Sequence, residues 1–189
     1  MCTLEKRGSV FILTLTGDDD HRLNPSLMDS LRSSLLRAKS QATRGSVLIT
    51  LAQGRFFSNG FDLLPPPSAA AASEFEEHMS RRVRAFKPLI ADLISFPMPT
   101  VAAVTGHAAA GGLVLALSHD YVLMRRDRGV LYMSDLDLGF TIPDYCTAVL
   151  KAKIGTAGAR RDVVVRAAKV RAEEAVKLGI VDSAHDSAE

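Results

Sequence analysis

The chain has 189 residues, of which 47% are hydrophobic and 23% charged, with 23 lysines and arginines against 21 aspartates and glutamates. This length predicts one main domain, and the apolar content excludes a disordered tail or a collagen-like polymer. The net charge of +2 gives no strong field for a nucleic-acid backbone or an anionic bilayer, so neither nucleic acid nor membrane is expected as a partner.

The two cysteines, Cys2 and Cys146, cannot form a disulfide framework, and the amino end does not resemble a signal peptide. Both features indicate a reducing, intracellular compartment. Residues 101–117 are almost free of charge but fall short of the roughly 20 residues that a spanning helix needs. They are predicted to form a buried strand, a tight turn and a buried helix.

The first predicted elements are a strand over residues 9–16, rich in β-branched and apolar residues, and a helix after it. Asn24 is a good N-cap and Pro25 suits the first helical position. Apolar residues then recur at helical spacing: Leu27, Leu31 and Leu35. A second strand over residues 46–52 leads into a glycine-bearing loop, residues 53–62.

Three prolines, residues 65–67, predict a loop before a long helix that begins near Ser73. Pro88 predicts a kink in this helix, and Pro97 and Pro99 end it. Its predicted buried side carries Val83, Phe86, Ile90, Leu93 and Ile94. Its predicted solvated side carries Glu74, Glu76, Glu77, Arg81, Arg82 and Arg84.

The remaining predicted elements continue the alternation of strands and helices. They are a strand at 100–104, a turn at 106–112, a helix to about 118, a strand at 120–124, and helices at about 145–153, 157–168 and 171–178, the last ending at Gly179. Such alternation predicts an α/β fold with largely parallel strands.

Two glycine-containing loops, residues 57–62 and 106–112, each follow a buried strand directly and can present bare backbone amides. A helix that begins near Gly111 adds its positive end to the second loop. Two such donors converging on a carbonyl oxygen would stabilise an enolate, although spacing alone favours simple turns. The five histidines show no metal-ligand spacing, so no metal site is expected.

Four motifs in order, residues 56–63 (FFSNGFDL), 97–108 (PMPTVAAVTGHA), 117–121 (LSHDY) and 133–136 (MSDL), resemble the crotonase (enoyl-CoA hydratase/isomerase) superfamily. Within it, the chain is most similar to the plant peroxisomal Δ3,Δ2-enoyl-CoA isomerases. The resemblance implies a spiral of β-β-α units in a single crotonase-like domain over residues 1–189. Its core would span about 1–145, with a partial, apparently truncated C-terminal helical part at about 146–189.

By motif position, the resemblance implies that the amides of Phe61 and Gly111 form an oxyanion hole for the thioester oxygen of an acyl-CoA. The substrate-binding residues that it implies are Arg55, Phe57, Ser58, Asn59, Gly60, Asp62, Leu63 and Gly112. Arg55 faces a phosphate in this interpretation, with a solvated arginine as the alternative. His107 is expected to be a packed turn residue rather than a base.

The carboxylates separate the reactions within this superfamily. Hydratases use two glutamates, and Val114 stands where the first would be. Isomerases need only one carboxylate, the glutamate of a Met-Ser-Glu motif. The corresponding residues here are Met133, Ser134 and Asp135, so the resemblance makes Asp135 the expected proton shuttle. Aspartate is one methylene shorter, and misplacing a catalytic group by an ångström costs on the order of 100-fold in rate. Asp137 and Asp144 are weaker alternatives, expected to be solvated or capping.

The resemblance therefore implies an enoyl-CoA delta isomerase of unsaturated fatty-acid β-oxidation. The alternatives are an enoyl-CoA hydratase or 3-hydroxyacyl-CoA dehydratase, and a catalytically impaired acyl-CoA-binding relic. No metal or redox cofactor is implied, since coenzyme A is part of the substrate. The expected assembly is a homotrimer, put in doubt by the short C-terminus. The expected compartment is the peroxisome, or otherwise the cytoplasm, because the final residues 187–189 are no peroxisomal address.

Overall fold

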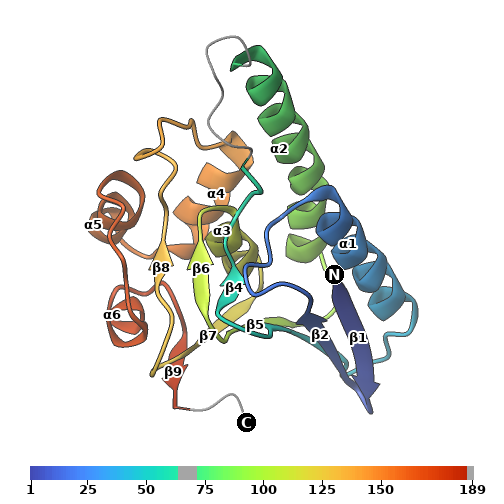
Figure 1. Cartoon of the computed structure of the whole chain (residues 1–189). Coiled ribbons are helices and arrows are strands. Elements are labelled where there is room, and N and C mark those ends of the chain that lie inside the picture. The colour runs from blue at the N-terminus through green and yellow to red at the C-terminus, as the bar shows by residue number, and fades with distance from the viewer. Residues whose placement is uncertain (64–71, 187–189) are drawn as a thin grey trace.

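Two sheets with helices around them make up the computed structural model, which describes residues 1–63 and 72–186 (Figure 1). The larger sheet has the strand order β1-β2-β3-β5-β7-β9, and the smaller has the order β4-β6-β8. The large-sheet strands are β1 (Cys2–Arg7), β2 (Val10–Leu15), β3 (Val47–Ala52), β5 (Thr100–Val104), β7 (Tyr121–Arg125) and β9 (Ser183–His185). The small-sheet strands are β4 (Phe56–Ser58), β6 (His107–Ala109) and β8 (Leu131–Tyr132). Only β1 and β2 pair antiparallel among these described strands.

The chain repeats a strand-strand-helix unit, and this repeat decides where the loops lie. The units are β3-β4-α2, β5-β6-α3 and β7-β8-α4, with α2 at Ala72–Ile94, α3 at Gly111–Leu117 and α4 at Asp144–Lys153. In each unit the first strand joins the large sheet and the second joins the small one. The predicted α/β fold and its β-β-α spiral are confirmed. Since β4, β6 and β8 are parallel, the segments that follow them leave the same edge of the small sheet.

Helix α1 (Pro25–Ser40) forms as its sequence predicts. The Asn24 side chain accepts a hydrogen bond from the Leu27 amide at 2.9 Å, and Pro25 opens the helix. Leu27, Leu31 and Leu35 are all buried. An ion pair between Arg32 and Asp92 links α1 to its neighbour α2 (Figure 1).

Helix α2 departs from its predicted pattern at three positions. Val83, predicted to be buried, is partly exposed. Phe86, Ile90 and Leu93 are buried as predicted, but Ile94 is 60% exposed. Ile94 is the last residue of the helix, which explains why the helical periodicity does not bury it. Arg82, predicted to be solvated, is only 7% exposed because it pairs with Asp62. The loop predicted at residues 65–67 lies outside the described residues, and the kink at Pro88 stays a prediction.

The C-terminal part joins the sheet as well as adding helices. Helix α5 (Ala157–Arg160) continues as a π-helical turn over Arg161–Val165, and α6 (Ala172–Lys177) follows. The chain then reverses at Gly179, whose φ of +64° favours glycine, and β9 pairs parallel with β7. The polar sequence of β9 gave no strand signal. The division of the chain near residue 145 stays a prediction.

The apolar stretch 101–117 belongs largely to the core, as predicted, and it comprises all of β5 after Thr100, then β6 and α3. All seven residues of α3 are buried. Within residues 1–63 and 72–186, no helix is long and apolar enough to span a membrane. Both cysteines are free.

Candidate active site

A pocket of about 140 Å³ lies where the segments after β4, β6 and β8 converge. Four expected site residues, Asn59, Phe61, Leu63 and Asp135, line it together. The other lining residues are Arg22, Met79, Ala109, Ala110, Ser134, Leu138 and Phe140. The pocket wall is largely apolar, with one carboxylate and one guanidinium among these side chains.

The two glycine loops meet beside this pocket. Gly60 has a φ of +72°, and a Cβ there would lie 3.1 Å from the Ala109 oxygen and 3.4 Å from the Gly111 nitrogen. Bond lengths limit the distance from that Cβ to the next amide nitrogen, that of Phe61, to about 3.7 Å. The amide nitrogens of Phe61 and Gly111 are therefore within about 7 Å of each other. Two donors that share one oxygen are at most about 6 Å apart, and the upper bound of about 7 Å allows that spacing.

Neither of these two amides donates to a backbone or side-chain acceptor within the described ranges 1–63 and 72–186. Gly111 is the first residue of α3, where amides have no partner inside the helix. The carbonyl that shares a peptide unit with the Phe61 amide is that of Gly60, and it accepts from Leu23 at 2.8 Å. A peptide unit whose oxygen accepts a hydrogen bond is polarised, which makes its N–H a stronger donor.

The same polarisation applies to the second amide. The Ala110 oxygen shares its peptide unit with the Gly111 amide, and it accepts from Leu113 at 3.0 Å and from Val114 at 3.2 Å. Ala110 itself has a φ of +48° and a ψ of −119°, which an L-residue rarely adopts. Its amide donates to the Tyr132 oxygen at 2.9 Å, and this bond fixes the end of β6 against β8. The strained residue thus lies directly before the second candidate donor.

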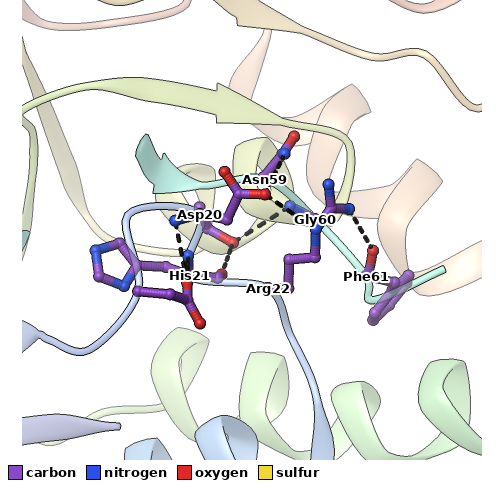
Figure 2. A network of polar contacts seen from close by, with 8 residues as sticks. Asp20, His21, Arg22, Asn59, Gly60 and Phe61 are labelled. Atoms are coloured by element: carbon purple, nitrogen blue, oxygen red, sulfur yellow. Dashed lines mark hydrogen bonds and ion pairs between the residues drawn. The ribbon is translucent and has the colours of Figure 1, made fainter. Parts of the chain in front are cut away.

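The segment before α1 holds the first glycine loop in place, as Figure 2 shows. The backbone amide of Asn59 donates to the backbone oxygen of Asp20 at 2.8 Å, and the Ser58 hydroxyl donates to the backbone oxygen of His21 at 2.8 Å. Arg22 donates to the Phe61 oxygen at 3.4 Å and pairs with the Asp20 carboxylate at 3.2 Å. The loop geometry therefore depends on a segment about 40 residues away in sequence.

Asp135 is the carboxylate of the pocket. Its Oδ2 is buried and has no hydrogen-bond partner among residues 1–63 and 72–186, and burial raises the pKa of this carboxyl above its ordinary value. Its backbone oxygen accepts from the Phe140 amide at 2.8 Å, which closes the turn that carries the side chain. Burial also raises the pKa of the nearby Cys146 thiol to about 12, with a smaller contribution from the Asp135 charge. A carboxylate with a raised pKa and a free oxygen is suited to take up a proton.

Two other positions singled out in the sequence are structural in this arrangement. Val114 lies in α3 and is 1% exposed. His107 accepts from the Val130 amide at 3.2 Å through Nδ1. Burial, and then the charge of Arg55, lower the pKa of its imidazole. His107 does not line the pocket.

The expected substrate-binding residues divide into two groups. Asn59 and Leu63 line the pocket beside Phe61, and Gly60 lies close to two other lining residues, Ala109 and Ala110. The structure does not bring Arg55, Phe57, Ser58, Asp62 or Gly112 to the pocket wall. Phe57 and Ser58 are fully buried, and Gly112 packs so closely that a Cβ would lie 2.2 Å from the Ser58 oxygen. Arg55 is exposed over the ring of Phe56. The binding roles of all these residues stay predictions.

Four pocket residues were not predicted from the sequence: Arg22, Met79, Leu138 and Phe140. Arg22 lies in the short segment before the N-cap of α1, next to an acidic turn, and offers no local signal. Met79 is on the helical face of α2 one turn before Val83, so helical periodicity alone could have suggested it. Across residues 1–63 and 72–186, no group of three or more histidines, cysteines and acids could hold a metal ion.

Comparison with known proteins places these observations in a family. Residues 5–189 match the family described as enoyl-CoA hydratase/isomerase. The chain is 57% identical to Enoyl-CoA delta isomerase 2, peroxisomal, of Arabidopsis thaliana, over all of this chain and 79% of that protein. It is also 57% identical to Enoyl-CoA delta isomerase 1, peroxisomal, of the same organism, covering 76% of that protein.

A solved structure supports the fold. An enoyl-CoA hydratase/isomerase family protein from Silicibacter pomeroyi aligns with a TM-score of 0.84 at 23% identity, over all of this chain and 76% of that one. At this identity the likeness concerns the fold alone. The crotonase fold expected from the motifs is confirmed.

Proposed function

The chain belongs to the enoyl-CoA hydratase/isomerase family, and from this premise we propose that it is an enoyl-CoA delta isomerase. Its reaction moves the double bond of a 3-enoyl-CoA to the 2-trans position. This step prepares unsaturated fatty acids for β-oxidation. Two Arabidopsis relatives at 57% identity carry the name of this activity, which supports the proposal.

In the proposed mechanism, the thioester oxygen accepts hydrogen bonds from the amides of Phe61 and Gly111. The Asp135 carboxylate takes a proton from C2 of the substrate, and the electron pair moves into the C1–C2 bond, which places negative charge on that oxygen. The protonated Asp135 then returns the proton to C4. The double bond is left between C2 and C3, so no atom is gained or lost and one group serves as base and acid.

One observation carries this proposal: Asp135, whose buried Oδ2 has no partner in the described part of the chain, lines the same pocket as Phe61. Leaving such an oxygen unpaired costs folding free energy, so a native site that retains it has a use for it. The raised pKa supports the first step of the mechanism, because a carboxylate that holds a proton more tightly is the stronger base towards C2.

The hydratase alternative needs a second acid to activate water. Val114 stands at the position of that acid, and its side chain is aliphatic and buried. A relic that binds acyl-CoA without turnover is the remaining alternative, because aspartate is shorter than the glutamate of the isomerase motif. The pocket is compatible with binding in all three cases, so the products must distinguish them.

Product analysis with purified protein tests the proposal. A 3-enoyl-CoA should give the conjugated 2-enoyl-CoA, and 2-enoyl-CoA should give no 3-hydroxyacyl-CoA. Asp135→Ala should lower kcat at least about 100-fold, since one essential acid/base group contributes on that scale. Asp135→Glu should match or exceed the original activity. Asp137→Ala is the matched control, because Asp137 is an exposed carboxylate two residues away and should leave kcat unchanged.

Formation of 3-hydroxyacyl-CoA from 2-enoyl-CoA would show a hydratase instead. Acyl-CoA binding without any product would support the relic. We further propose, from family resemblance, a homotrimer and a peroxisomal location, the latter in line with the names of two relatives. Light scattering of the purified protein tests the trimer. The proposed reaction needs no metal or redox cofactor, because the protein supplies both the acid/base group and the oxyanion donors.

A further inference from the structure

Arg82 of α2 is a buried charge within a run of basic residues. The neighbouring Arg81 and Arg84 are exposed, whereas Arg82 is 7% exposed. Its Nε donates to Nε2 of His78, one turn earlier, at 2.8 Å, and its Nη2 donates to Oδ2 of Asp62 at 3.3 Å. Arginines are rarely this buried unless their charge is paired. Within the described residues, Asp62 is the carboxylate that compensates it.

Asp62 is the residue after Phe61, so this ion pair reaches the loop that carries the first candidate oxyanion donor. One turn further along α2, the buried Phe86 ring packs edge-on against the Phe61 ring, with centroids 5.3 Å apart and planes at 85°. Helix α2 therefore holds two consecutive loop residues, one by aromatic packing and the next by an ion pair. The segment before α1 holds the same loop from its other side through the Asp20 and Leu23 backbones.

We propose that Arg82 is a positioning residue, which fixes the Phe61 amide in the oxyanion hole by anchoring Asp62 to α2. This inference rests on the proposed function, in which the Phe61 amide binds the thioester oxygen. Arg82 itself does not line the pocket. Its effect on the reaction therefore passes through Asp62 and the main chain of the loop.

The two members of the Arg82–Asp62 ion pair differ in their exposure to solvent, which decides the choice of variant. The Asp62 side chain is 44% exposed, so water can solvate it once Arg82 is removed, and the loop is then free to move. Asp62→Asn instead leaves the buried guanidinium without its carboxylate, which is the more damaging loss for the fold. Arg82→Met is the better first variant, because methionine keeps much of the length and the apolar stem of arginine without its charge.

Arg82→Met is expected to lower kcat about tenfold or more while KM changes less than about threefold, because a displaced oxyanion donor acts mainly on the transition state. Arg81→Met is the matched control and should behave as the original protein. Arg82→Lys should recover part of the lost kcat, since lysine keeps the charge facing Asp62 but not the second donor to His78. In the double variant Arg82→Met/Asp62→Asn, kcat should fall no further than in the worse single variant.

A second readout does not need turnover. It uses a saturated acyl-CoA labelled with ¹³C at the thioester carbonyl. Binding to the original protein should shift the infrared band of this carbonyl to lower frequency than in the free ligand. The shift should be smaller in Arg82→Met at similar affinity. If Arg82→Met lowers only the unfolding temperature and changes neither kcat nor this band, or if the two losses in the double variant add, the assignment is wrong. A band shift that depends on Arg82 in a protein without isomerase activity would overturn the proposed function and leave the Arg82 assignment standing.

Discussion

Gly60→Ala is the substitution that most directly tests the meeting of the two loops. The backbone at Gly60 has a φ of +72°, and the new methyl group would lie 3.1 Å from the Ala109 oxygen, 3.2 Å from the Ala110 Cβ and 3.4 Å from the Gly111 nitrogen. The left-handed conformation costs an L-residue about 1–2 kcal/mol. For a chain of this size, that corresponds to a decrease in Tm of roughly 2–8 °C, so the protein should remain folded.

The effect on catalysis should be larger than the effect on stability. The first two contacts are tighter than ordinary carbon packing, so the Ala109–Gly111 backbone or the Gly60 loop must move by a few tenths of an ångström. Removal of one oxyanion donor elsewhere costs on the order of 100- to 1000-fold in kcat. A partial displacement of one donor should therefore lower kcat by about 10- to 100-fold.

Steady-state kinetics with a 3-enoyl-CoA, together with thermal unfolding, separate the two effects. Gly8→Ala is the control, because Gly8 has a similar φ of +62° but nothing within 4 Å of its Cβ position. Both variants bear the cost of the left-handed conformation, so Gly60→Ala should lose at least as much Tm as Gly8→Ala, and only Gly60→Ala should lose kcat. Equal kcat in the two variants would show that the Gly60 and Gly111 loops do not form the oxyanion site together.

Two predictions concern the core. Burial lowers the pKa of His119 from 6.5 to about 4. As the pH falls, the imidazole therefore takes up a proton in the unfolded chain before it does so in the folded one. The free energy of unfolding should be full above about pH 6.5 and fall by about 3 kcal/mol as the pH drops to about 4. Urea unfolding at pH 7 and pH 4.5 checks this, and His119→Gln, which cannot titrate, should lose less stability over that range; equal losses would contradict it. Gly112→Ala would place a methyl group 2.2 Å from the Ser58 oxygen, which is backbone, and should cost about 3 kcal/mol or more. A methyl group at Gly111 would have side-chain atoms as its nearest neighbours, the movable Leu23 at 3.1 Å and the Phe61 ring at an ordinary 3.7 Å, so equal Tm values for the two variants would refute this reasoning.

The sequence by itself determined the elements whose signals are local. The start of α1 follows from Asn24 and Pro25, and β5 coincides with the β-branched run predicted at residues 100–104. Both signals act within a few residues, through a capping side chain and side-chain shape, so no distant contact is needed to read them. The motifs around Phe61 and Asp135 likewise indicated the fold and two residues that line one pocket.

Strands of two or three residues gave no such signal. Within the predicted loops, β4 and β6 are visible only through their pairing, and the polar β9 forms because β7 offers it a free edge. The pairing of β4, β6 and β8 decides that Arg22, Met79 and Phe140 share a pocket with the motif residues.

Tertiary structure also decided the state of individual charges. Arg82 has the same local sequence context as the exposed Arg81, yet it is buried because the loop after β4 places Asp62 against α2. Asp135 follows a short strand like many solvated turn residues, yet packing around it removes water and raises the pKa of its carboxyl. Burial and pKa depend on what surrounds a side chain in space, and segments distant in sequence supply those surroundings.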